Sequence, residues 1–293
     1  MFYYSGHQPS NSLQIDNDSS SNSDSLQQTH PNDFFLVGTD GFFHSINRPL
    51  PTVTRIIIDD LVKQYTILWK DAVISVYLRG SHLNGEVKGK TDFDTVVVLK
   101  DFVAIDLQKV FAYINNSLQH KYPFIKYFDT YVINESAIAN NRYLQFVVSV
   151  LSMRVYGEPI EKGFTRFKPN KDCIFLLHNL PQKLAMATQM DRMQADFNQQ
   201  IIFNHVIKHL LRSAQELVLE REKCYTRNIT LCQSLFARYY PDQAQLSHTL
   251  LKSYNVGQST KLVLLMEQFS QILREEYGKL YPAASDQLLT RVD

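Results

Sequence analysis

The chain has 293 residues, of which 44% are hydrophobic and 20% are charged, and its formal net charge at pH 7 is +1. These proportions are typical of globular proteins and exclude wholesale disorder and collagen-like composition. The near-neutral charge excludes a global basic field for nucleic acids, and three cysteines are too few for a disulfide framework or a four-thiolate zinc site.

The sequence contains no segment that suggests membrane insertion or export. No apolar run reaches the ~18 residues that a membrane-spanning helix needs. The opening run MFYYSGHQPSNS lacks the basic start and the apolar stretch of a signal peptide. We therefore expect a cytoplasmic protein with reduced cysteines and no membrane partner.

Residues 1–33 differ in composition from the rest of the chain. They are rich in Ser, Asn, Gln and Asp and contain no Lys or Arg. Such a segment has too little apolar surface to offset the entropy lost on ordering, so we predict a disordered polar tail. The rest of the chain keeps all 30 basic residues and loses some of the 29 acidic ones, which leaves a modest positive balance suited to an anionic ligand. Residues 34–51, which end in a pair of closely spaced prolines, are predicted to form a linker.

Residues 52–164 are predicted to form a domain in which helices and strands alternate. Its first helix carries Ile57, Leu61 and Tyr65 on one face, at spacings of one helical turn. β-Branched and aromatic runs that end in glycine or turn residues predict strands. The expected elements are, in chain order, a helix over 52–71, strands over 72–80 and 92–100, a helix over 101–120, a strand over 124–133 and, over 141–157, either one helix or a strand followed by a helix.

The pattern changes at about residue 165, where strand-like runs disappear and amphipathic helical periodicity dominates. The clearest helix is predicted over 199–223, with apolar residues recurring every three to four positions. Two more helices are expected over 228–238 and 260–280. The sequence therefore predicts an α+β protein with two domains: a small mixed-sheet catalytic domain over 52–164 and an all-α helical bundle over 165–285.

The residues that indicate chemistry lie where the first two predicted strands meet. The first strand ends in Gly80 and Ser81, and the second opens with Asp92 and Asp94. Side chains two apart on a strand face the same way, so two carboxylates project together beside a glycine turn. Like charges held that close are costly unless a cation lies between them, and Mg²⁺ is a natural partner of carboxylate oxygens.

A third acid stands in the next predicted strand. In KYFDTYVI, Asp129 alternates with Phe128 and Thr130 and points away from them. A neighbouring strand in an antiparallel or mixed sheet would bring Asp129 beside Asp92 and Asp94, which gives the carboxylate count of a two-metal site. An isolated acid pair or Gly-Ser turn is usually a solvated turn. Their combination in this order indicates a site for a metal-bound triphosphate.

The run GSHLNGEVKGKTDFDTVVV resembles the signature of the DNA polymerase β-like nucleotidyltransferase superfamily, in which Gly-Ser is followed, after a spacer, by an acid-x-acid strand. With Gly85 and Lys88 in the spacer, the run is most similar to that of bacterial aminoglycoside (streptomycin/spectinomycin) adenylyltransferases. The run RVYGEPI over 154–160 resembles the end of the catalytic domain in many of these enzymes. A helical C-terminal domain also resembles the family, whose members close the nucleotide cleft with one.

This resemblance implies a nucleotidyltransferase that depends on Mg²⁺ or Mn²⁺. It implies that Gly80 and Ser81 contact the triphosphate of ATP or another NTP. It also implies that Asp92 and Asp94 bind the metal and that Asp129 is the third acid, either a metal ligand or a general base. The adenylyltransferases carry Glu at that last place, so Asp129 is shorter by one methylene group.

Basic and aromatic residues supply further candidates for the nucleotide site. His82 directly follows Gly-Ser and is expected near the phosphates. Lys208 and Arg212 lie four apart on a predicted helix and would neutralise triphosphate oxygens, the alternative being a solvated basic stripe. Tyr225 and Arg227 follow that helix and would stack on the nucleotide or clamp it.

Two other kinds of site are disfavoured. His205 and His209 have a spacing that occurs in helical zinc sites, but no Glu follows His205 and no third ligand is evident in the sequence. A helical domain beside a nucleotidyltransferase also suggests the HEPN ribonucleases, which use Arg and His separated by four to six residues. No His stands at that spacing from Arg212, Arg221, Arg227 or Arg238 in the predicted helical domain.

Two functions of different classes stay open. The first is an enzyme that moves an NMP, AMP foremost, from a metal-bound NTP to a hydroxyl and releases pyrophosphate. Its acceptor is a protein hydroxyl, an RNA 3′ end or a small molecule, with a polycationic aminoglycoside disfavoured by the positive body. The second is a catalytically weak nucleotide-binding or toxin–antitoxin-type partner-binding protein of the same fold. A monomer and a homodimer are both compatible with either function.

Overall fold

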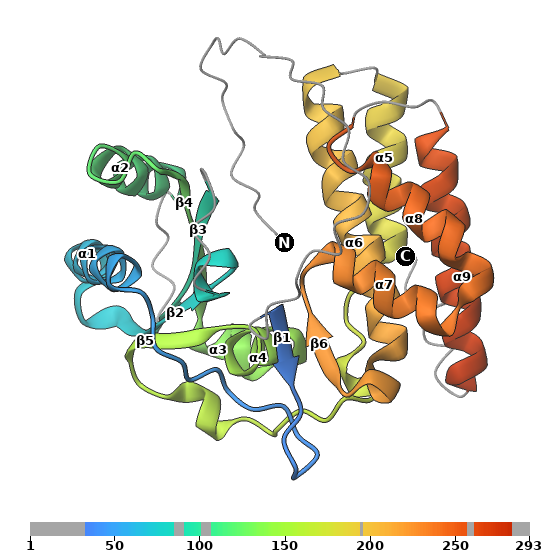
Figure 1. The fold of residues 1–293 in the computed structure, drawn as a ribbon. Helices are drawn as coiled ribbons and strands as arrows, with labels where there is room; N and C mark the ends of the chain where they lie inside the picture. Colours follow the sequence, from blue (N-terminus) through green and yellow to red (C-terminus); the bar gives the residue numbers. More distant parts are fainter. Residues whose placement is uncertain (1–32, 85–90, 101–106, 194–195, 257–260, 283–293) are drawn as a thin grey trace.

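The computed structural model describes residues 33–84, 91–100, 107–193, 196–256 and 261–282. Residues 1–32 of the tail predicted over 1–33, the spacer residues Gly85 and Lys88, and the start of the helix predicted over 101–120 lie outside these ranges. The described part contains a four-stranded sheet with helices on both faces and an all-α bundle beside it (Figure 1). The predicted α+β fold class, with a small mixed sheet followed by a helical bundle, is confirmed.

The sheet has the strand order β4-β3-β2-β5. Its central strand β2 (Val73–Arg79) pairs antiparallel with β3 (Thr91–Leu99) and with β5 (Met153–Gly157). β3 pairs parallel with β4 (Ile125–Asn134). The two parallel strands are joined through α2 (Leu107–Gln119), because parallel neighbours need a crossover rather than a hairpin. The sheet is therefore mixed.

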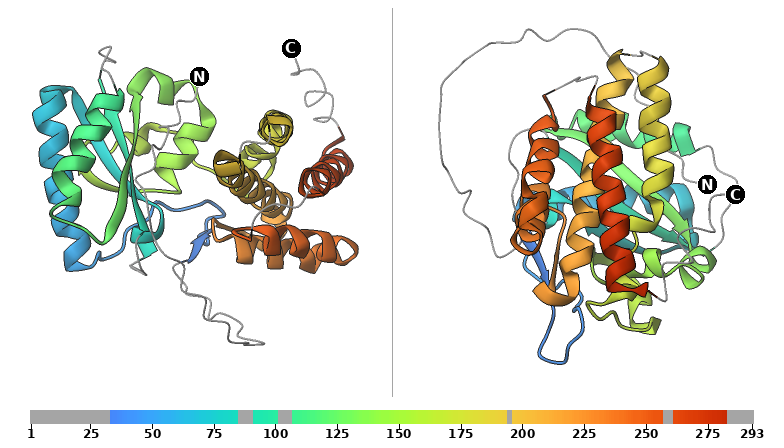
Figure 2. Two further views of the ribbon diagram at one scale, coloured as in Figure 1. Left: turned by 90° about the horizontal axis from the view of Figure 1, so that it is seen from above. Right: turned by 90° about the vertical axis from the view of Figure 1, so that its right-hand side faces the viewer.

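Helices cover both faces of the sheet (Figure 2). α1 (Thr52–Trp69) and α2 lie on one face, and their apolar side chains form one core with the strands. α3 (Glu135–Ala139) and α4 (Arg142–Ser149) lie on the other face and share a second core with residues of the helical domain. Most of β2 and the second half of β3, from Thr95 to Leu99, are buried on both faces, which explains why these stretches are rich in Val and other apolar residues.

The segment 141–157 differs from both predicted alternatives. It forms helix α4 first and strand β5 second, rather than one helix or a strand followed by a helix. Asn141 caps α4 by accepting a hydrogen bond from the backbone N–H of Leu144 at 3.1 Å, so the helix begins directly after Asn141. β5 pairs with β2 on one side only, and four of its five residues are exposed or half-buried in succession, so its apolar alternation is weak.

The helical domain is built around α6 (Asp196–Glu222), which contacts all four other helices of the bundle. Its apolar side chains face the bundle core, where Val206, Leu210 and Ala214 are completely buried. No helix within the described ranges is long and apolar enough to cross a membrane. The other helices of the bundle are α5 (Leu180–Met193), α7 (Ile229–Tyr239), α8 (Ala244–Ser253) and α9 (Leu262–Leu280).

A second, two-stranded sheet joins the first described segment of the chain to the helical domain. β1 (Phe34–Leu36) pairs antiparallel with β6 (Cys224–Thr226), the strand that follows α6 (Figure 1). The segment 34–51, expected to be a linker, therefore contains a strand, because its apolar residues find a partner in the helical domain. The described part of the chain thus begins beside the helical domain, continues into the sheet domain and then enters the bundle.

Candidate active site

Three charged side chains lie in one row across three neighbouring strands. Arg79 at the end of β2 pairs with Asp94 on β3, and Asp94 pairs with Asp129 on β4. Asp92 lies two residues before Asp94 and faces the same way. The parallel register between β3 and β4 thus brings together the three acids that the sequence singled out, and it adds an arginine beside them.

The opposite face of the sheet holds this register in place. Tyr65 of α1 is completely buried, and its hydroxyl hydrogen-bonds Thr95 Oγ1 at 2.8 Å and Thr130 Oγ1 at 2.6 Å. Thr95 and Thr130 directly follow Asp94 and Asp129, so their side chains point to the other face. One tyrosine therefore ties β3 to β4 behind the two carboxylates.

Gly80 is required by the close approach of the Asp94 carboxylate. Its φ is +77°, a left-handed conformation that residues with a Cβ rarely adopt. A Cβ at Gly80 would also collide with Oδ2 of Asp94. Ser81, which begins a 3-10 turn over Ser81–Asn84, is exposed beside this contact. The turn predicted to approach a triphosphate therefore lies directly against the second acid.

The environment of Asp94 differs from that of its two neighbours. Burial raises the pKa of Asp94 to about 6, although the positive charges of Arg79 and Arg227 act in the opposite direction. The negative charges of Asp129 and Asp92 raise it further. Asp92 and Asp129 are exposed, so Asp94 is the half-buried centre of the group. An added cation would stabilise the ionised carboxylates.

Three arginines from both domains surround this centre. Arg79 belongs to the sheet, and Arg212 of α6 donates from Nε and Nη2 to the backbone oxygen of Arg227, each at 3.1 Å. Burial, and then the charge of Arg227, lower the pKa of Arg79 and that of Arg212, the latter to about 10. Nη1 of Arg227 is buried and finds no hydrogen-bond acceptor within the described residues. Positive charge therefore gathers around a single half-buried acid, which favours an anionic ligand.

Arg79 was missed by the sequence reasoning, although a signal existed. It stands directly before Gly80 in a strand whose other residues are apolar or hydroxylic. A charged residue inside a buried strand needs a partner or a ligand. Alternation along the strand would have placed Arg79 on the same face as the acids of the next strand.

His82 and Tyr225 lie in the core rather than at the surface of the acid row. His82 is completely buried on the opposite side of β3, where its ring contacts Phe93 with 4.6 Å between centroids, and its Nε2 bonds Thr91 Oγ1 at 2.9 Å. Burial lowers the pKa of His82 to about 4. Tyr225 is 2% exposed, and its ring packs edge-on against Phe146 in the contact between the domains. The structure does not bring these two side chains together with Asp92, Asp94 and Asp129.

Lys208 and Arg212 share one face of α6, but they have different neighbours. Arg212 meets the arginines of the acid site, as described above. Lys208 lies one turn further toward the start of α6, where its Nζ is 5.1 Å from the ring centroid of Tyr254. His209 turns to the bundle, and its Nε2 bonds the backbone oxygen of Leu176 at 2.7 Å. The structure thus links Arg212, rather than Lys208, to the acids.

The acids suit a divalent cation as a pair rather than as a triad. Among the described residues, no group of three or more His, Cys, Asp or Glu side chains is close enough to hold a metal ion. Asp92 and Asp94 face the same way, and their mutual repulsion would be relieved by a cation. Because Mg²⁺ is usually bound by one or two carboxylates together with substrate phosphates, this pair fits a metal that arrives with a nucleotide.

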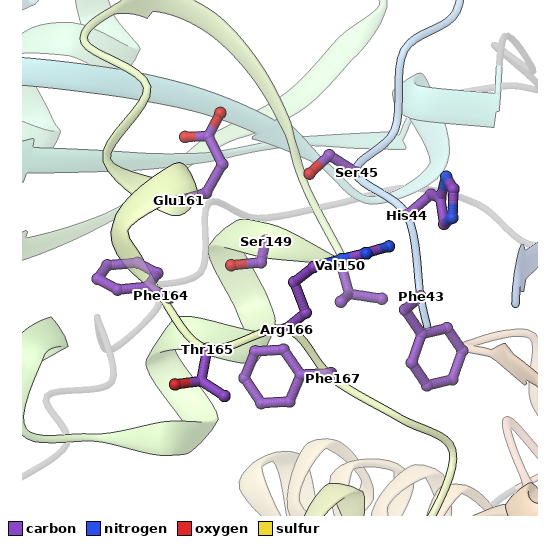
Figure 3. A pocket seen from close by; sticks show the side chains of 10 residues that line it. All are labelled: Phe43, His44, Ser45, Ser149, Val150, Glu161, Phe164, Thr165, Arg166 and Phe167. Carbon is purple, nitrogen blue, oxygen red and sulfur yellow. The ribbon is translucent and has the colours of Figure 1, made fainter. Parts of the chain in front are cut away.

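A cavity of about 340 Å³ lies apart from this site, beside the end of α4 (Figure 3). Its lining includes Phe43, Ser149, Glu161 and Arg166, and none of the predicted site residues. Glu161 accepts a hydrogen bond from the Tyr77 hydroxyl at 2.6 Å. The cavity therefore lies between the second core and residues 161–167, which follow the last strand of the sheet domain.

Comparison with known proteins gives a weak likeness to solved structures. No family model matches the chain, and no curated protein matches it. Among solved structures, it is similar to that of spectinomycin adenyltransferase AAD(9) from Enterococcus faecialis with ATP and spectinomycin, at 13% identity and a TM-score of 0.41. The match covers 75% of this chain and 98% of that one. At this TM-score the likeness assigns neither a family nor an activity to the chain.

Proposed function

We propose that the protein is a nucleotidyltransferase that moves an NMP from a metal-bound NTP, ATP foremost, to a hydroxyl group. The observation that carries this proposal is the row Arg79, Asp94 and Asp129, with Asp92 on the same face and Gly80 against Asp94. Paired carboxylates next to buried arginines suit a ligand that combines a divalent cation with a polyanion. An NTP bound to Mg²⁺ or Mn²⁺ is such a ligand.

In this reaction the carboxylates and the arginines have separate tasks. Asp92 and Asp94 would hold the metal, which would neutralise charge on the triphosphate. Arg79, Arg212 and Arg227 would bind phosphate oxygens, and Nη1 of Arg227, which has no acceptor among the described residues, would gain one. Because these groups are held by the fold before the substrate arrives, they would stabilise developing charge without reorganisation.

Asp129 would take the proton from the acceptor. It is exposed, and it pairs across the sheet with Asp94, so a hydroxyl beside the α-phosphate could reach it. The acceptor oxygen attacks the α-phosphorus, the bond to the bridging oxygen of the β-phosphate breaks, and pyrophosphate leaves. The proton of the hydroxyl passes to the Asp129 carboxylate.

A label-transfer assay tests this function. Purified protein, Mg²⁺ and each of the four NTPs, radiolabelled at the α-phosphate, are added to a cell lysate. The matched variants are Asp92→Asn/Asp94→Asn and, as an exposed acid outside the site, Asp71→Asn. We expect covalent label with the wild type and Asp71→Asn and a loss of at least about 100-fold in the double variant. Equal labelling by the double variant would refute the assignment.

The alternative is a catalytically weak nucleotide-binding or partner-binding protein. It is favoured by the absence of a three-ligand metal cluster among the described residues and by the short side chain of Asp129. This alternative predicts metal-dependent binding of a non-hydrolysable ATP analogue without transfer of label. Calorimetry on the wild type should show binding in both cases, and the label-transfer assay then separates them, because only the enzyme transfers label.

A further inference from the structure

One face of α6 is turned away from the bundle core and is basic. Ile201, His205, Lys208 and Arg212 follow at spacings of four, three and four residues, so they share one side of the helix. Ile201 is 41% exposed, and none of the four belongs to the buried cluster that fills the bundle. We call His205, Lys208 and Arg212, together with Lys183 of the neighbouring helix α5, the basic stripe.

The members of the basic stripe act on one another. Burial lowers the pKa of His205 to about 4, and the charges of Lys183, Arg212 and Lys208 lower it further. No carboxylate within the described ranges contributes to this shift. Lys208, Arg212 and Lys183 therefore carry the positive charge of the basic stripe along α6 and onto α5, and His205, with this lowered pKa, adds none near pH 7.

The basic stripe begins at the acid site. Arg212 holds the backbone oxygen of Arg227, and Arg79 contributes to the shift of the Arg212 pKa, so this end of the stripe lies beside the acid row. From Arg212 to His205 the helix rises by about 10 Å. The stripe is thus longer than the group of arginines that a triphosphate would occupy, and it leads away from the acids.

An aromatic side chain is fixed beside the stripe. Tyr254 lies against Lys208, and the next residue, Asn255, is held at a φ of 67°. Asn204 secures it twice: its Oδ1 accepts from the backbone N–H of Asn255 at 3.1 Å, and its Nδ2 donates to Asn255 Oδ1 at 3.0 Å. A half-buried ring next to a cation is a platform of the kind on which an unpaired base stacks.

We propose that the acceptor is single-stranded RNA, whose phosphates lie along the basic stripe and whose 3′ hydroxyl takes the NMP. The inference rests on the proposed nucleotidyl transfer. The 3′ oxygen attacks the α-phosphorus of the NTP, pyrophosphate leaves, and the proton goes to Asp129. Charge complementarity selects this acceptor: the stripe attracts a polyanion and repels polycationic aminoglycosides.

Binding is measured apart from catalysis, by fluorescence anisotropy with a 5′-labelled RNA of about 12 nucleotides. The full-length Asp92→Asn/Asp94→Asn protein is titrated between about 50 and 200 mM NaCl. We expect Lys183→Gln/Lys208→Gln in this background to bind about tenfold more weakly and to lower the salt slope by about 0.7 per lost phosphate contact. Lys279→Gln, an exposed lysine on α9, is the matched control and should leave both values unchanged.

Four outcomes contradict the proposal. RNA that binds no tighter than a neutral oligomer overturns it, and so does an unchanged salt slope in Lys183→Gln/Lys208→Gln. An equal loss of affinity for a non-hydrolysable ATP analogue in that variant would assign the lysines to the nucleotide instead. Label transferred by the wild type to a protein or a small molecule, with RNA unlabelled, would leave the transferase standing and refute the acceptor. Stripe-dependent RNA binding with no transfer at all would refute the proposed function but support the RNA site.

Discussion

At Asp94, burial disfavours the ionised carboxylate, whereas the positive charges of Arg79 and Arg227 favour it. Burial raises its pKa in the folded protein to about 6, above the ordinary value of an aspartate. Between about pH 4 and pH 6 the folded state therefore binds more protons than the unfolded state, so stability falls as the pH rises through this window.

This direction of the pKa shift predicts how the unfolding free energy of the metal-free wild type changes with pH relative to that of Asp94→Asn. Relative to Asp94→Asn, the wild type should lose on the order of 2 kcal/mol of unfolding free energy between pH 4 and pH 7, because only the carboxylate must ionise in a half-buried place. Urea unfolding at several pH values measures the difference. A difference that stays constant with pH would show that Asp94 is not held in a desolvated environment.

Gly80 gives a second prediction at this scale. Gly80→Ala should abolish most activity and cost about 1–2 kcal/mol of stability, because the new Cβ has a strained φ and meets the Asp94 carboxylate. Gly41→Ala is the matched control: Gly41 has a φ of +78° and no atom within 4 Å of the added Cβ. Denaturant unfolding and the labelling assay on both variants separate backbone strain from displacement of Asp94. Equal effects of the two substitutions would contradict the contact.

Among the elements, α1 contributes to the site without reaching it. The buried hydroxyl of Tyr65 bonds Thr95 and Thr130, so its loss leaves two buried hydroxyls with fewer partners. Tyr65→Phe should cost about 1–2 kcal/mol and lower kcat by loosening the register of β3 against β4. Tyr113→Phe, at a tyrosine of α2 that is 48% exposed, is the control for loss of a hydroxyl. The same urea midpoint for Tyr65→Phe and wild type would refute this role.

The elements also show what could be predicted from sequence. Periodicity was sufficient for α1, β2, β3, β4 and α6, because each is a long run with one dominant period. It failed for β1, β5 and β6, which are short edge or paired strands stabilised by partners distant in the chain. The three acids were found by motif, whereas Arg79 and the contribution of Arg227 depend on strand register and on domain packing.

For the whole molecule, β1 is one of the elements that contribute to the contact between the domains. The half-buried ring of Phe35 packs against both cores of the sheet domain and lies 6.2 Å from the ring of Tyr225 in the helical domain. Phe35→Ala should cost about 2–3 kcal/mol and increase cleavage between the domains in limited proteolysis. Leu36→Ala, at a neighbour that is 62% exposed, should change little. Similar proteolysis of the two variants would show that β1 does not hold the domains together.

The pairing of β1 with β6 also determines when β1 can reach its folded position during synthesis of the chain. Phe34 is among the first described residues to leave the ribosome, yet its partner Thr226 is made only after both the sheet and α6. Domains fold largely in the order of their synthesis, so the acid row can form while β1 still has no strand to pair with. Arg212 and Arg227 arrive late as well. A nascent or prematurely terminated chain would therefore present the acids and Arg79 without Arg212 and Arg227, and the proposed ligand site would be complete only after α6 and β6 have been made.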